Sequence, residues 1–253
     1  MQSYSSRFWE IDVLRGIAII MMIIYHFSYD LYFLAGCNIK IYSSYWAIFQ
    51  RTTASLFLLL VGISLTISYS RKKNEYPRKK LFLRNTLRGI KIFIWGCLIT
   101  IFTLIFLDSG TIFFGILHLI GVSIVLSYPF LDYKYKNLIF GISFILISYF
   151  LGNFNFNTPY LLWLGFEPES FFSFDYFPLI PWFGVVLIGI FLGNLIYPDG
   201  KRIFKISDLS NLLIIKQLSF LGKHSLKIYI LHQPIIILIL YSLGFADLSF
   251  IGI

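Results

Sequence analysis

Residues 12–30 read DVLRGIAIIMMIIYHFSYD, and this stretch decides the fold. Its apolar middle is long and uncharged enough to indicate a membrane-spanning helix. Polar side chains recur through it at steps of three, four or seven residues, so they share one helical face. On that face the guanidinium of Arg15 and the imidazole of His26 are about 16 Å apart along the helix axis. An ionisable group this deep indicates a functional site, the alternative being a hydrogen bond to a neighbouring helix.

The whole chain has the composition of a multi-pass membrane protein. It has 253 residues, of which 58% are hydrophobic, 20% aromatic and only 13% charged, which is too apolar for a soluble domain of this size. Its two cysteines, Cys37 and Cys97, lie in different segments and suggest neither a disulfide nor a metal site. The net charge is +9, and the positive residues lie between apolar spans in the pattern that membrane topology requires. We therefore expect a protein of the cell membrane, with lipid as a partner and no nucleic acid.

We expect one all-α transmembrane domain over residues 1–253, with the amino terminus in the cytoplasm and the carboxyl terminus outside. The segment Arg71–Lys91 holds nine lysines and arginines, a density that the positive-inside rule assigns to the cytoplasm. The segment Gly152–Phe177 holds none and is expected outside, and an amphipathic surface helix is expected near residues 209–220. Glycines in the sixth span favour close helix packing. The pattern fits seven spans, at about 14–34, 46–68, 90–107, 111–130, 138–151, 178–197 and 225–243.

Three histidines, His26, His118 and His232, fall near the middle of predicted spans. Imidazole titrates near neutrality and can take a proton from an amine or a hydroxyl, which favours a general base. A metal site is less favoured, because the usual tight spacing of histidine ligands does not occur. Asp30 follows His26 by four residues, and its carboxylate can either orient that imidazole or pair with Arg51. The sequence leaves both pairings open.

Basic side chains gather at helix ends on the predicted cytoplasmic side. They can grip the phosphates of a donor such as coenzyme A, or they can contact lipid headgroups and fix the topology. Arg15 differs from the others because it shares the face of His26, where a lipid contact is less natural. We expect the donor to be bound by residues among Arg15, Arg84, Arg88, Lys91 and Lys223.

Five motifs follow one another along nearly the whole chain: DVLRGIA (12–18) with His26 and Asp30, FLLLVGIS (57–64), GILHLIG (115–121), FPLIPWFG (177–184) and LGKHSLKIYILHQP (221–234). Together they resemble the prokaryotic branch of the heparan-α-glucosaminide N-acetyltransferase catalytic family. The resemblance implies a membrane acyltransferase that moves an acetyl group from cytoplasmic acetyl-CoA to a sugar across the membrane. In lysosomal members the histidine taken as catalytic follows the first span, whereas residues 32–44 hold none here. The role of His26 therefore follows from its depth and its face.

The sequence thus predicts an acetyl-CoA-dependent N- or O-acetyltransferase that uses no metal. His26 is expected to be the base, assisted by Asp30, His118 and His232. A glycan acceptor, such as an amino sugar, is expected to contact residues among Arg51, Trp182, Ser225 and Tyr229, the last two sharing a face with His232. Two alternatives stay open, a proton-linked carrier or channel using the same polar face and a scaffold without a small-molecule site. A homo-oligomer is compatible with each of them.

Overall fold

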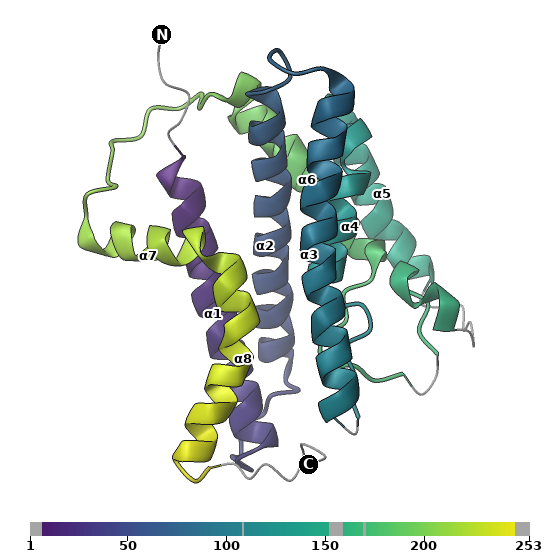
Figure 1. Cartoon of the computed structure of the whole chain (residues 1–253), viewed down its shortest axis with the longest axis vertical. Coiled ribbons are helices and arrows are strands. Elements are labelled where there is room, and N and C mark those ends of the chain that lie inside the picture. Colours follow the sequence, from purple (N-terminus) through teal and green to yellow (C-terminus); the bar gives the residue numbers. More distant parts are fainter. Residues whose placement is uncertain (1–6, 108, 152–158, 169–170, 246–253) are drawn as a thin grey trace. The chain divides into compact units, whose positions relative to one another are not determined.

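The computed structural model describes residues 7–107, 109–151, 159–168 and 171–245 (Figure 1). This part of the chain is helical, as its long apolar runs predict. Short 3₁₀ turns occur at Tyr128–Phe130, Pro159–Leu164 and Pro198–Gly200. The α-helices are α1 (Trp9–Phe33), α2 (Ser44–Ser70), α3 (Arg78–Phe106), α4 (Ile116–Leu126), α5 (Tyr135–Leu151), α6 (Leu179–Ile196), α7 (Leu213–Lys223) and α8 (Ser225–Ser242).

Five of these helices, α1, α2, α3, α6 and α8, are long and apolar enough to cross a membrane. They confirm a multi-pass membrane protein. Helices α4 and α5 have 11 and 17 residues, or about 16 and 25 Å, which is less than a hydrocarbon core of about 30 Å. The count of seven spans and the orientation stay predictions. The expected amphipathic helix is present as α7.

The fourth predicted span is wrong in its bounds. A non-helical segment occupies its first residues, because the backbone amides of Phe174 and Phe177 donate to the carbonyls of Gly110 and Phe114. The Asp175 carboxylate then accepts a hydrogen bond from the first amide of α4 at 3.1 Å, which satisfies one of the donors left open at a helix start. The third span differs in the other direction, since α3 begins well before residue 90 and includes basic residues.

The chain divides into two compact units, which are described separately. Unit 1 contains residues 1–57 and 206–250, and therefore α1, the first half of α2, α7 and α8. The backbones of α7 and α1 approach each other closely where the two helices cross (Figure 1). Gly16 lies against the carbonyl of Leu218, and Gly222 lies against the carbonyl of Asp12, with no room for a Cβ atom at either glycine. Helix α8 packs on the later turns of α1 around Ile236 and Leu240.

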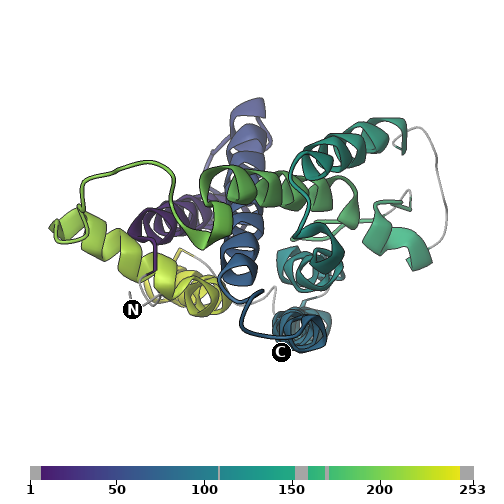
Figure 2. The same cartoon turned by 90° about the horizontal axis from the view of Figure 1, so that it is seen from above.

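Unit 2 contains residues 58–205 and is built from closely packed helix pairs. Helices α3 and α4 run side by side, and so do α5 and α6 (Figure 2). The second half of α2 also meets α6, where Gly189 lies against the Leu59 carbonyl and Gly193 against Thr66. The close contacts expected from glycines in the sixth span are therefore confirmed.

Candidate active site

The imidazoles of His26 and His232 meet inside unit 1, on α1 and α8. Their ring centroids are 4.7 Å apart and their planes are inclined by 67°. His26 is half-buried and His232 is buried. The sequence placed both rings at mid-span but on different helices, and the packing of α8 on α1 joins them. The two histidines thus form a single imidazole pair.

The hydrogen bonding of His232 fixes which of its nitrogens can act as a base. Its Nδ1 lies 2.6 Å from the backbone carbonyl of Tyr229, and a carbonyl can only accept, so Nδ1 carries the proton. Its Nε2 then presents a lone pair. This nitrogen is buried and has no hydrogen-bond partner among the described residues. A buried, unpartnered lone pair is costly unless a ligand completes it.

Asp30 binds neither of the two partners that the sequence suggested. Its carboxylate oxygens accept from Nε2 of Gln233, at 2.9 and 2.8 Å. The side chain of Arg51 is exposed, and no ion pair joins it to Asp30 within the part of the chain described. Because a carboxylate only accepts, the amide nitrogen of Gln233 faces it, and Oε1 points elsewhere. That oxygen is also buried without a partner in the described residues.

Gln233 is the functional candidate that sequence reasoning missed. It follows His232 directly and precedes Pro234, a residue that removes one backbone donor from α8. The neighbouring His232 and Pro234 could have pointed to Gln233 as a site residue. Its partner could not be found in this way, because Asp30 is 203 residues away in the chain. Successive residues of α8 thus contact successive turns of α1, His232 with His26 and Gln233 with Asp30.

His118 lies in unit 2, where both of its ring nitrogens have partners. The Gly115 amide donates to Nδ1 at 3.2 Å, so Nε2 carries the proton and faces the Thr100 hydroxyl at 3.4 Å. That hydroxyl donates in turn to the Ile112 carbonyl. The ring is 4% exposed and lies between two phenylalanine rings. The sequence predicted His118 near the middle of a span, but in the structure it occupies the first turn of α4. This arrangement favours a role in joining α3 to α4.

The comparison with known families decides the identity. The family described as "Heparan-alpha-glucosaminide N-acetyltransferase, catalytic" matches residues 7–234. The chain belongs to this family. It is therefore a member of a family of transmembrane acetyltransferases, as the five motifs predict. No curated protein and no solved structure matches the chain.

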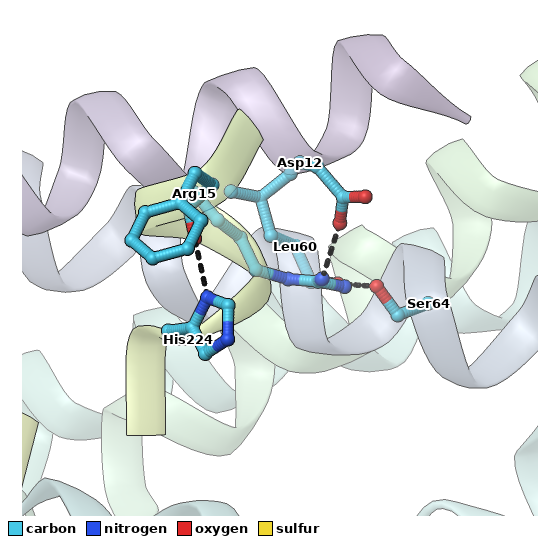
Figure 3. Close-up of polar contacts among 6 residues, drawn as sticks. Asp12, Arg15, Leu60, Ser64 and His224 are labelled. Atoms are coloured by element: carbon cyan, nitrogen blue, oxygen red, sulfur yellow. Dashed lines mark hydrogen bonds and ion pairs between the residues drawn. The ribbon is translucent and has the colours of Figure 1, made fainter. Parts of the chain in front are cut away.

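For a transmembrane acetyltransferase, Arg15 is the basic residue nearest to the imidazole pair along α1. Its Nη1 lies 3.1 Å from Oδ1 of Asp12, one turn earlier on the same helix (Figure 3). Asp12 is 2% exposed, and its second oxygen, Oδ2, is buried without a hydrogen bond in the described residues. The pair holds the guanidinium on the same helical face as His26, so Arg15 is pre-oriented, and a donor phosphate would compete with Asp12 for it.

A second basic group lies in unit 2, at the start of α3. Arg84, Arg88 and Lys91 follow one another at helical spacing and are exposed. Lys72, in the turn before α3, belongs to the same group. Burial lowers its pKa first, and the guanidiniums of Arg84 and Arg88 lower it further, against an opposing effect of Glu75. Cations that disfavour one another's charge are stabilised by a bound anion, which fits the phosphates of coenzyme A.

The remaining predicted residues lie at different places. Ser225 and Tyr229 belong to α8 of unit 1, and the Tyr229 ring is 5.5 Å from that of His232. Lys223 is exposed at the end of α7, next to His224, whose Nδ1 is 2.9 Å from the Phe220 carbonyl (Figure 3). Trp182 belongs to unit 2, where its ring packs 5.0 Å from that of Phe177.

Proposed function

We propose that this protein transfers an acetyl group from acetyl-CoA to a primary amine of a glycan acceptor, with the His26–His232 pair as general base. The observation that carries the proposal is a pair of unpartnered acceptor atoms on successive residues of α8. Nε2 of His232 and Oε1 of Gln233 are both buried and without hydrogen-bond partners among the described residues. Beside them, the Asp30 carboxylate also only accepts.

A site lined by acceptors selects a ligand that is rich in donors. An amine offers two N–H groups, enough for Nε2 and Oε1 together, whereas a hydroxyl offers one. A site whose buried polar groups are completed by the substrate discriminates strongly against an analogue that leaves one of them unpaired. The geometry therefore favours N-acetylation over O-acetylation.

The proposed step is a direct transfer that conserves atoms and charge. The amine nitrogen attacks the thioester carbonyl carbon, a C–N bond forms and the C–S bond breaks. The proton leaving the nitrogen passes to Nε2 of His232, and from the imidazole to the departing thiolate of coenzyme A. The His26 ring makes an edge-to-face contact with the ring that accepts this proton. General bases of this kind contribute about 10²- to 10⁴-fold to rate.

Donor binding is assigned to the basic side chains. Arg15 lies about 16 Å along α1 from His26, a length comparable with the extended pantetheine arm of acetyl-CoA. We propose that Arg15 binds a phosphate of the donor. Arg84, Arg88, Lys91 and Lys72 form a separate basic group in unit 2, and we propose independently that this group binds donor phosphate. The glycan enters from the side of the membrane opposite to the donor. Ser225, Tyr229 and Arg51 of unit 1 are the side chains proposed to contact it, and Trp182 of unit 2 is proposed separately as an acceptor contact.

The decisive experiment uses the purified full chain in proteoliposomes with labelled acetyl-CoA. Two acceptors are compared that differ at one atom, a glucosaminide and the corresponding glucoside. We expect acetylation of the glucosaminide, with the amide identified by mass spectrometry, and at least 100-fold less of the glucoside. Acetylation of both acceptors alike would contradict the amine-selective site. Solute or proton flux without any acyl donor, and no acetyl transfer with it, would favour the carrier hypothesis instead.

A further inference from the structure

Helix α7 has two faces with different surroundings. One face packs on α1, where Gly222 and the buried Ser219 lie at the contact. The opposite face is largely apolar and open, with Leu213 and Ile214 each 70% exposed and Phe220 60% exposed, and it also includes the exposed Gln217. Apolar side chains this exposed and this close together need a cover other than water.

The level at which α7 crosses α1 identifies that cover. The two close glycine approaches between α7 and α1 are at Asp12 and Gly16 of α1, immediately before the apolar run of that helix begins at Ile17. That level is where a spanning helix passes from the headgroup region into hydrocarbon. Because α7 lies across α1 at this level (Figure 1), it lies along the membrane surface. Helices of this kind bury their apolar face at the boundary between headgroups and acyl chains.

The charges of α7 add a preference among lipids. Lys216 and Lys223 are seven residues apart, so they lie on one edge of the helix, and both are exposed. Lys227 is exposed at the start of α8. The described residues of α7 include no acidic side chain. Lysines beside an interfacial apolar face reach the phosphates of anionic lipids with their ammonium groups.

We infer that α7 is an interfacial anchor that binds anionic phospholipid through Lys216 and Lys223. Leu213, Ile214 and Phe220 are buried among the acyl chains. This inference concerns the lipid environment of the protein and does not depend on the proposed chemistry. It also assigns Lys223 to a lipid headgroup and not to the acyl donor. Each lysine contributes about fivefold to the preference for anionic lipid.

The test places a fluorophore on the apolar face of α7. Cys37 and Cys97, both free thiols, are replaced by serine, and Ile214→Cys is labelled with an environment-sensitive dye. The protein is held in nanodiscs at one chain per disc, which excludes a second copy as the cover. Lipids with a spin-labelled tail, carrying either a phosphatidylglycerol or a phosphatidylcholine headgroup, are compared as quenchers. Asp208→Cys, an exposed position before α7, is the control site.

We expect strong quenching at position 214, weak quenching at position 208, and a preference for the phosphatidylglycerol quencher at position 214. The double variant Lys216→Glu/Lys223→Glu should reduce that preference about 25-fold, while Lys79→Glu/Lys136→Glu, the same charge change in unit 2, leaves it unchanged. Equal quenching by both lipids would overturn the anionic site. If the dye at position 214 is unquenched and its emission indicates an apolar environment, protein covers this face. If its emission indicates exposure to water, α7 is not interfacial. Each of these results would overturn the proposal.

Discussion

His26 and His232 face each other across α1 and α8, with 4.7 Å between their ring centroids and 206 residues between them in the chain. The first and last described helices that are long enough to cross a membrane thus each supply one imidazole. Neither helix contains the pair by itself. The chemistry proposed for this protein depends on that contact between the two rings.

Removing the proposed base should reduce turnover without unfolding the protein. For His232→Ala we expect kcat for acetyl transfer to fall by about 10²- to 10⁴-fold, because the acceptor amine loses its proton acceptor. His26→Ala should also reduce kcat, and the double variant should be no worse than the more damaged single variant, since the two rings act as a unit. Rates are measured with labelled acetyl-CoA. His224→Ala, in the same unit, is the matched control and should retain kcat within about twofold. Losses that multiply in the double variant would argue against a shared function.

The contact between Asp30 and Gln233 is best tested by measuring the stability of variants. Gln233→Leu removes the amide that donates to the buried Asp30 carboxylate, and should lower the free energy of unfolding by about 1–3 kcal/mol. A second substitution, Asp30→Asn, should restore part of that loss. Thermal unfolding in detergent gives the coupling energy from the double-mutant cycle. The same cycle with Asp30 and Arg51 should give a coupling near zero, and a large value there would restore the pairing that the structure does not show.

His118 should behave as a structural residue. For His118→Ala we expect a loss of about 1–3 kcal/mol in stability, since the Gly115 amide and the Thr100 hydroxyl lose their partner. Turnover per folded molecule should fall much less than in His232→Ala. Gly96→Ala tests the same contact from the other side, because a Cβ there would lie 2.9 Å from the His118 ring. A collapse of kcat in folded His118→Ala would return this histidine to the catalytic group.

The basic group of unit 2 predicts a pH dependence of donor binding. The pKa of Lys72 lies below the ordinary value for lysine, so its ammonium is the first of these charges to be lost as pH rises. The KM for acetyl-CoA should therefore increase at alkaline pH, through that lowered pKa. Lys72→Met should raise the KM at neutral pH and flatten the alkaline increase, with kcat unchanged. Lys79→Met, an exposed lysine on the same segment, should leave the profile as it is.

The contact between α7 and α1 depends on the absence of a side chain at Gly222. Gly222→Ala places a methyl group into the Asp12 carbonyl, and we expect about 1–3 kcal/mol of destabilisation from the displaced backbone. Gly36→Ala offers a comparison, because open space surrounds that loop glycine and only its φ of +64° opposes a side chain. Its cost should be smaller, about 1 kcal/mol. Thermal unfolding midpoints of the two variants show which substitution destabilises the protein more.

Sequence reasoning found the helices because most of them are encoded locally. Long apolar runs place α1, α2, α6 and α8 within a few residues of their bounds, and the amphipathic pattern over residues 209–220 indicates α7, which begins at Leu213. The bounds of α4 could not be found in the same way. They depend on hydrogen bonds from residues 174–177, about 60 positions later in the chain, which hold the preceding segment out of the helix.

The candidate site shows the same division. Periodicity alone brought Arg15, His26 and Asp30 onto one face, and this agrees with the structure. The partner of Asp30 could not be predicted from α1, because His26 was suggested by its spacing of four residues and Arg51 by its charge. The actual partner is the neutral amide of Gln233 on α8. The position of His118 could not be predicted from the sequence, because its hydrogen-bond partners belong to α3 and to the segment before α4. Its assisting role stays a prediction.

The distance in the chain between the two imidazoles also concerns biosynthesis. A polypeptide released before residue 232 would hold His26, Arg15 and the basic start of α3, yet it would lack the second ring. Such a fragment would retain the basic groups proposed to bind coenzyme A, but it would lack the proposed base. On the proposed mechanism, activity would appear only once translation has passed α8, so premature termination would yield an inert product and not one that wastes thioester.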